Sequence, residues 1–111
     1  MKRARNALRA FIETREFSKG KYVVTRDAHE CRLILNGQMI ARYRFAPGHV
    51  GKIEGTLAGN HSNATRATLN ALMIALHLNR EIITRDGVNF IRSTIEPATP
   101  VELSPFEWFR F

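Results

Sequence analysis

The sequence predicts an α+β fold: a single, mostly antiparallel sheet with two helices packed on one face and an irregular aromatic C-terminal tail. Two segments carry apolar residues at the 3.6-residue period of a helix, and six short segments bounded by turn residues resemble strands. Two hairpin dipeptides, Asn36-Gly37 and Asp86-Gly87, lie between strand pairs. A chain of 111 residues has room for one domain. We expect this α+β domain to span residues 1–93, followed by a Pro-rich tail at 94–111.

Residues 2–16 are predicted to form the first helix. One helical face, with i, i+4, i+7, i+8 and i+11 spacing, is formed by Ala4, Leu8, Phe11, Ile12 and Arg15. Basic residues come early in this helix and acidic residues late, which opposes the helix dipole. This order indicates either selection for a property other than helix stability or a solvated face with an Arg9–Glu13 pair. Ser18 and Gly20 end the segment.

Strands are predicted at 21–26, 31–36 and 38–45, with a turn at 27–30. Asn36-Gly37 favours a type I′ turn, which needs positive φ at both central residues. A further short strand is expected at 52–57, where Gly55 indicates an edge or a bulge.

The second helix is predicted at 63–79, with Ser62 or Asn63 as its N-terminal cap. Its apolar stripe is wide, so we expect it to lie against the sheet. A closing hairpin follows, with strands at 81–85 and 88–93 around Asp86-Gly87.

The last eighteen residues differ in composition from the rest. Three prolines, Pro97, Pro100 and Pro105, are expected to prevent regular structure there. Four of the ten aromatic residues lie in the final six positions: Phe106, Trp108, Phe109 and Phe111. These aromatic residues either fold back onto the sheet or form a partner-binding end, which includes a homodimer made through the tail.

The net charge of +7 is concentrated at one end of the chain. Eight of the 17 basic residues lie within residues 1–26, together with two of the ten acidic residues. Such an asymmetry indicates a polyanionic partner: nucleic acid first, and an acidic protein or membrane surface second. No apolar run is long enough to span a membrane, and we expect no membrane partner. The N-terminus has no apolar stretch typical of a secretory signal. The single cysteine, Cys31, fits a reducing cytoplasm.

Residues 33–92 carry a recognisable order of motifs. The Asn-Gly hairpin is followed by Ile40-Ala41, then by the run Ala58-Gly59-Asn60-His61-Ser62-Asn63-Ala64-Thr65-Arg66, the pair Leu69-Asn70 and the hairpin around Asp86-Gly87. This order resembles small uncharacterised proteins of tailed bacteriophages, which carry a Gly-x-His-type turn before a helix with a Leu-Asn or Ile-Asn pair. Here Ser62 and Asn63 stand where that pattern has threonines. The resemblance implies a phage origin and action in the bacterial cytoplasm, but no particular activity.

Three groups of residues are candidate nucleic-acid contacts. Lys2, Arg3, Arg5 and Arg9 lie on the first helix, and Arg42 and Arg44 share one face of the first hairpin, opposite to Tyr43 and Phe45. The turn before the second helix supplies His61, Ser62 and Arg66, because a helix N-terminus with an arginine one turn in suits a phosphate group. The alternatives are ordinary helix capping for the turn and solvated faces for the arginines.

The sequence shows no pattern typical of a metal site or of a catalytic site. His29-Glu30-Cys31 has too few ligands for a metal site, and no second ligand pair lies at a suitable spacing. No phosphate-binding glycine loop, nucleophile elbow or catalytic motif is present. We therefore expect neither an enzyme nor a bound cofactor.

The charge asymmetry favours a small basic nucleic-acid-binding protein that acts through phosphate contacts and has a regulatory role. The resemblance implies that this protein is phage-encoded. Single-stranded DNA or RNA is favoured over duplex, because four predicted strands separate the two helices and exclude a helix-turn-helix. The alternative is a phage protein that binds and inhibits or redirects a host protein, such as a polymerase or a defence enzyme.

Overall fold

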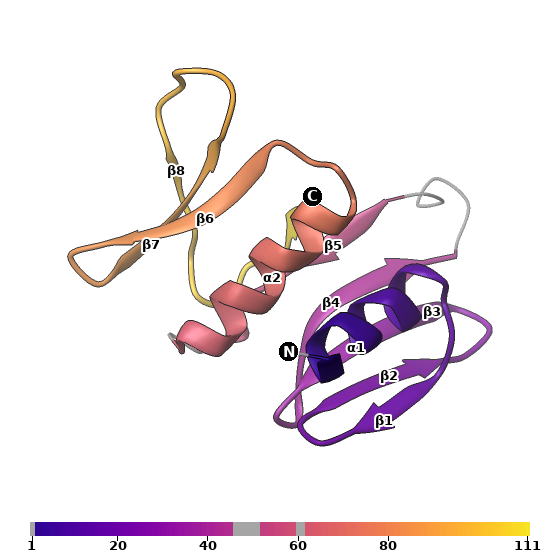
Figure 1. Cartoon of the computed structure of the whole chain (residues 1–111). Coiled ribbons are helices and arrows are strands. Elements are labelled where there is room, and N and C mark those ends of the chain that lie inside the picture. The colour runs from indigo at the N-terminus through magenta and orange to yellow at the C-terminus, as the bar shows by residue number, and fades with distance from the viewer. Residues whose placement is uncertain (1, 46–51, 60–61) are drawn as a thin grey trace.

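The computed structural model describes residues 2–45, 52–59 and 62–111 (Figure 1). In chain order the elements are α1 (Lys2–Ile12), β1 (Phe17–Lys19), β2 (Tyr22–Arg26), β3 (Glu30–Leu35), β4 (Gln38–Arg44), β5 (Ile53–Gly55), α2 (Asn63–Ala75), β6 (Arg80–Arg85), β7 (Val88–Ser93), β8 (Val101–Glu102) and β9 (Phe109–Arg110). The α+β class and the antiparallel pairing are confirmed.

The described strands form two sheets, so the expected single sheet is wrong. The first has the order β1-β2-β3-β4-β5-β9, and the second has the order β6-β7-β8. Figure 1 shows α2 between the two sheets, and it contacts β4 of the first and β6 of the second. The wide apolar stripe of α2 is the physical reason, because this helix has more than one side to bury. The expectation that both helices cover one face of one sheet fails for the same reason.

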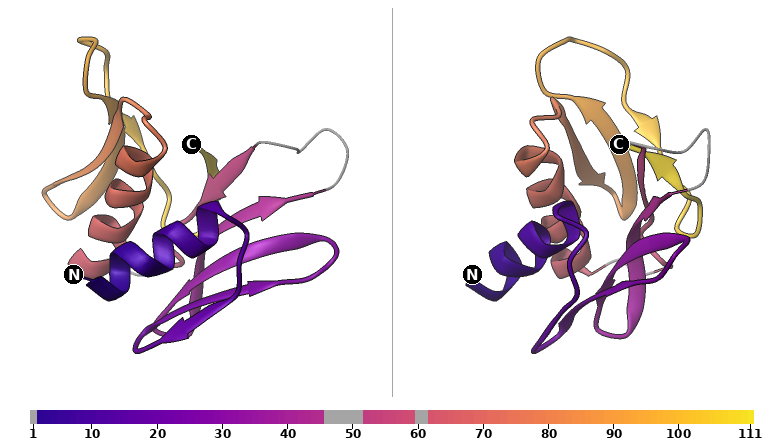
Figure 2. Two further views of the ribbon diagram at one scale, coloured as in Figure 1. Left: turned by 45° about the vertical axis from the view of Figure 1, so that its right-hand side comes forward. Right: turned by 90° about the vertical axis from the view of Figure 1, so that its right-hand side faces the viewer.

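The first helix packs across one face of the first sheet, where it contacts β1, β2 and β3 (Figure 2). Ala7, Ala10 and Phe11 are each 0% exposed. The facing strands contribute buried residues at alternate positions, namely Tyr22, Val24, Cys31, Leu33 and Leu35. Two alanines on the buried side let the helix backbone approach the sheet closely, and the Phe11 ring fills space between the helix and the sheet.

The predicted apolar face of the first helix is buried only in part, because the helix differs from the prediction at its C-terminal end. Leu8 and Phe11 are buried as expected, but Ile12 is 36% exposed and Arg15 lies beyond the helix. The helix ends at Ile12 rather than at 16, and Thr14 follows with a positive φ of 53°. The chain then turns into β1, a short edge strand that the sequence did not reveal.

Both predicted hairpin turns are confirmed by their backbone angles. Asn36 and Gly37 have φ values of 52° and 79°, and Asp86 and Gly87 have φ values of 50° and 77°. Positive φ at both central residues is the requirement of a type I′ turn. The pairing of β3 with β4 also shifts register next to Ile34, and both Ile40 and Ala41 are buried there although they are adjacent in the chain.

The C-terminal segment is more regular than its prolines indicated. Val101 and Glu102 pair with β7, and Phe109 and Arg110 pair with β5. The three prolines lie outside these two short strands, so none removes a backbone donor from the pairing. The tail therefore contacts both sheets of its own chain.

We expect Phe11→Ala to lower the free energy of unfolding by about 4 kcal/mol, because it opens a cavity under α1. Ile95→Ala is the control for an exposed apolar side chain, since Ile95 is 67% exposed. Urea denaturation followed by circular dichroism measures both. Equal, small effects of the two substitutions would show that α1 does not anchor the fold.

Candidate functional site

The helix α1 presents arginines on the side that faces away from the sheet. Arg5 and Arg9 are exposed and one turn apart, while Ala7, Ala10 and Phe11 hold the opposite side against the core. The basic surface continues beyond the helix, because Nη1 of Arg26 donates to the backbone oxygen of Thr14 at 3.0 Å.

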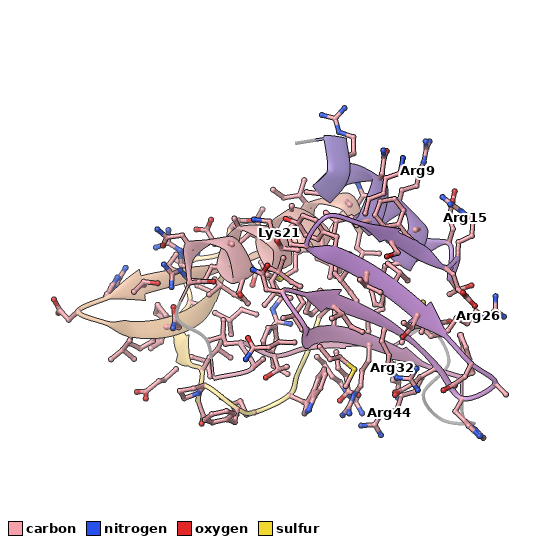
Figure 3. All side chains as sticks on the ribbon, turned by 90° about the horizontal axis from the view of Figure 1, so that it is seen from below. Arg9, Arg15, Lys21, Arg26, Arg32 and Arg44 are labelled. Atoms are coloured by element: carbon pink, nitrogen blue, oxygen red, sulfur yellow. The ribbon has the colours of Figure 1, made fainter. Side chains whose placement is uncertain are left out.

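Figure 3 shows Arg9, Arg15 and Arg26 one after another along one side of the molecule. We call the four residues Arg5, Arg9, Arg15 and Arg26 the basic strip. The guanidinium group of Arg26 also lies over the Phe45 ring, 5.3 Å from its centroid, so the β2 end of the strip is held in place. Lys21 lies apart from the strip in the same view.

The basic strip has few acidic partners. Arg15 pairs with Glu13 at 2.7 Å, but both side chains are about half exposed, so the pair is weak. Among the residues that the structure describes, no carboxylate lies within 4.0 Å of Arg5, Arg9 or Arg26. Lys2 and Arg3 begin the same helix, and their side chains lie outside the described part of the structure. The strip therefore carries a positive charge that the described part of the fold does not neutralise.

The two arginines of β4, in the hairpin that β3 and β4 form, have an acidic partner. Nε of Arg42 and Nε of Arg44 lie 3.2 and 3.4 Å from the same carboxylate oxygen of Glu54. The side chain of Arg42 is only 16% exposed. These two predicted contact residues are brought together, as expected from their shared face, but they already share a carboxylate.

Arg32 completes the charged outer face of β3 and β4. It bridges Glu30 at 2.7 Å and also binds the carboxylate of Asp27. The hydrogen bond from Arg32, followed by those from the backbone N–H groups of His29 and Glu30, holds the pKa of Asp27 well below its usual range. This face is therefore a set of ion pairs, whereas the basic strip is not.

The aromatic partner of Arg42 comes from the tail, which the sequence could not indicate. The guanidinium group of Arg42 lies 3.8 Å from the centroid of the Trp108 ring. Figure 1 shows the C-terminal end of the chain beside β5, and the pairing of β9 with β5 brings residue 108 to this face. Tyr43, the next residue of β4, packs partly buried against the core, as the alternation predicted.

The turn before α2 has the structure of an ordinary helix cap. Ser62 is the N-cap, and its Oγ accepts a hydrogen bond from the backbone N–H of Thr65 at 3.3 Å. A nitrogen of the Arg66 side chain donates to the amide oxygen of Asn63. His61, the third predicted contact in this turn, lies outside the described residues. The turn is thus distant in sequence from the basic strip, and its Ser62 side chain caps α2.

The tail also contacts this turn. The N–H of Gly59 donates to the Pro105 oxygen at 2.8 Å, and the Phe106 ring lies against Gly59 at a site that has no room for a β-carbon. Phe109 and Phe111 stack with centroids 5.6 Å apart, next to Gly55. The tail therefore folds back onto its own chain. A homodimer formed through it stays a prediction.

Cys31 and His29 do not form a reactive pair. The Cys31 thiol is completely buried and donates to the Phe11 oxygen at 3.9 Å, while His29 is exposed. Burial raises the pKa of the Cys31 thiol, which disfavours the nucleophilic thiolate. Within residues 2–45, 52–59 and 62–111, no three metal-ligating side chains gather. In these same ranges neither helix has the length and apolar character to cross a membrane.

Comparison of the chain with family models, curated proteins and solved structures finds no match.

We expect Arg42→Ala to destabilise the fold by about 1 kcal/mol through loss of the contact with Trp108. Trp108 is the only tryptophan, so its fluorescence reports on the tail, and its emission should move to longer wavelength. Arg85→Ala, on the distant β6–β7 hairpin, should change neither property. An unchanged emission spectrum in Arg42→Ala would contradict the stacked arrangement.

Proposed function

We propose that the protein binds nucleic acid through the basic strip, by contacts to phosphate groups. One observation carries the proposal. The fold places Arg5, Arg9 and Arg26 on one surface with no described carboxylate within 4.0 Å of any of them, whereas Arg32, Arg42 and Arg44 form ion pairs with Asp27, Glu30 and Glu54. Guanidinium groups suit phosphate oxygens because their planar forks donate two parallel hydrogen bonds.

Single-stranded DNA or RNA is the favoured form. The five strands β1–β5 separate α1 from α2 in the chain, so the two helices do not make a helix-turn-helix pair. The helix α1 also packs on β1, β2 and β3 of the first sheet (Figure 2). A strip of arginines with this placement favours contacts along a backbone, with little dependence on base sequence.

The other residues considered from the sequence contribute less to this proposal. Arg42 and Arg44 share the carboxylate of Glu54, Ser62 is the N-cap of α2, and the Arg66 side chain donates to Asn63. Lys2 and Arg3 extend the strip in the sequence. A phage origin, a regulatory role and action in the host cytoplasm stay predictions.

We expect Arg9→Gln to weaken binding of a fluorescently labelled single-stranded oligonucleotide. It should also lower the slope of log affinity against log salt concentration by about 0.7, the value for one lost phosphate contact on a single strand. Adding Arg5→Gln should lower the slope by about the same amount again. Fluorescence anisotropy at several salt concentrations measures both.

Arg85→Gln is the matched control for this experiment. It removes the same charge from the exposed end of β6, on the other sheet, and should leave the salt slope unchanged. An equal loss in Arg9→Gln and Arg85→Gln would mean that only net charge matters. Absence of binding by the natural sequence at low salt would overturn the proposal.

A further inference from the structure

An apolar groove runs between α1 and α2, on the side of α1 next to the basic strip. Its volume is about 670 Å³. Six apolar residues from the two helices form its floor: Ala4, Leu8, Ile12, Ala71, Ile74 and Ala75. We call this feature the interhelical groove.

The floor of the interhelical groove leaves large apolar side chains in contact with solvent. Ile74 is 71% exposed and Ile12 is 36% exposed, although both belong to helices that pack on the core. Neither exposure helps the fold, since burying such a side chain is favourable. Both side chains line the same groove, so this exposed apolar surface is gathered in one place.

The shape of the groove suits a helix. From Ala4 to Ile12 the floor is about 12 Å long at 1.5 Å per residue, which is roughly two helical turns. Three alanines, Ala4, Ala71 and Ala75, leave space for a backbone to lie close to the floor. A helix that lies in a groove uses apolar anchors at i, i+3 or i+4, and i+7, and two turns accommodate such a set.

The rim of the groove determines the charge of its occupant. Arg5 and Arg9 line it, together with Glu13. Two arginines against one glutamate leave the rim with a net positive charge. The part of α2 that lines the groove, Ala71, Ile74 and Ala75, adds no charged side chain.

We propose that the interhelical groove binds a short amphipathic helix of a partner protein, with its apolar face on the floor and acidic residues toward Arg5 and Arg9. A second copy of this chain fits less well. A symmetric pairing through this face would bring the two positively charged rims together. The C-terminal tail of the same chain is not the occupant of the groove, because its strand β9 pairs with β5.

This inference goes beyond nucleic-acid binding and gives the protein-partner hypothesis a specific surface. Arg5 and Arg9 belong both to the groove rim and to the basic strip, so an acidic helix and a nucleic acid would compete for them. Ile74 belongs to the groove alone. Its substitution therefore separates the two activities.

The test uses the full chain and a fluorescein-labelled synthetic peptide that forms an amphipathic helix of leucine and glutamate. A second peptide carries lysine in place of every glutamate. Ile74→Gln removes the more exposed of the two exposed isoleucines of the floor without changing the charge. Ile95→Gln is the matched control, since Ile95 is 67% exposed and lies outside the groove.

We expect the leucine–glutamate peptide to bind and the leucine–lysine peptide not to bind. Ile74→Gln should weaken peptide binding about tenfold, the effect of losing one buried isoleucine contact. Ile95→Gln should bind as the natural sequence does, and both variants should retain oligonucleotide binding if the basic strip functions as proposed.

Three results would overturn the proposal. The first is failure of the leucine–glutamate peptide to bind. The second is equal binding of the two peptides, or equal weakening by Ile74→Gln and Ile95→Gln. The third is a dimer of the natural sequence in sedimentation that Ile74→Gln dissociates, because a second copy would then occupy the groove.

Discussion

Ala7, Ala10 and Phe11 of α1 are completely buried against the first sheet, and the placement of the candidate functional groups depends on this contact. A helix has one rotation about its axis at which these three side chains all face the sheet. That rotation turns Arg5 and Arg9 toward solvent. It also leaves Leu8 and Ile12 at the edge of the contact, where α2 meets α1 to form the interhelical groove. The apolar packing thus sets the position of the charges.

The two surfaces of α1 differ in what they can bind, although they share arginines. The basic strip offers charge, with Arg26 held by Thr14 and by the Phe45 ring. The interhelical groove offers apolar surface, and Arg5 and Arg9 of the basic strip lie on its rim. By contrast, the outer face of β3 and β4 is internally matched, since the three arginines Arg32, Arg42 and Arg44 pair with the three carboxylates of Asp27, Glu30 and Glu54. Unmatched charge distinguishes the basic strip from the outer face of β3 and β4.

Local features of the structure could be predicted from the sequence, whereas features that depend on long-range contacts could not. Asn36-Gly37 and the Ser62 cap are determined by neighbouring residues, and both were found as expected. The division into two sheets depends on which sides of α2 are covered, and helical periodicity does not contain that information. The stacking of Trp108 on Arg42 joins positions that are far apart in the chain, so no local pattern signals it. Arg42 and Arg44 share one face of β4 as the alternation predicts, but their common acidic partner Glu54 becomes evident only with the pairing of β4 and β5.

The most direct test of the account is nuclear magnetic resonance mapping of the backbone amides during titration with a single-stranded oligonucleotide. The account predicts that the largest chemical-shift changes occur in α1, in the turn at 13–16 and around Arg26, and that they diminish as salt is added. The amides of the β6–β7 hairpin should not move. Changes centred on that hairpin, or on the capping turn before α2, would contradict the assignment of the basic strip as the nucleic-acid interface.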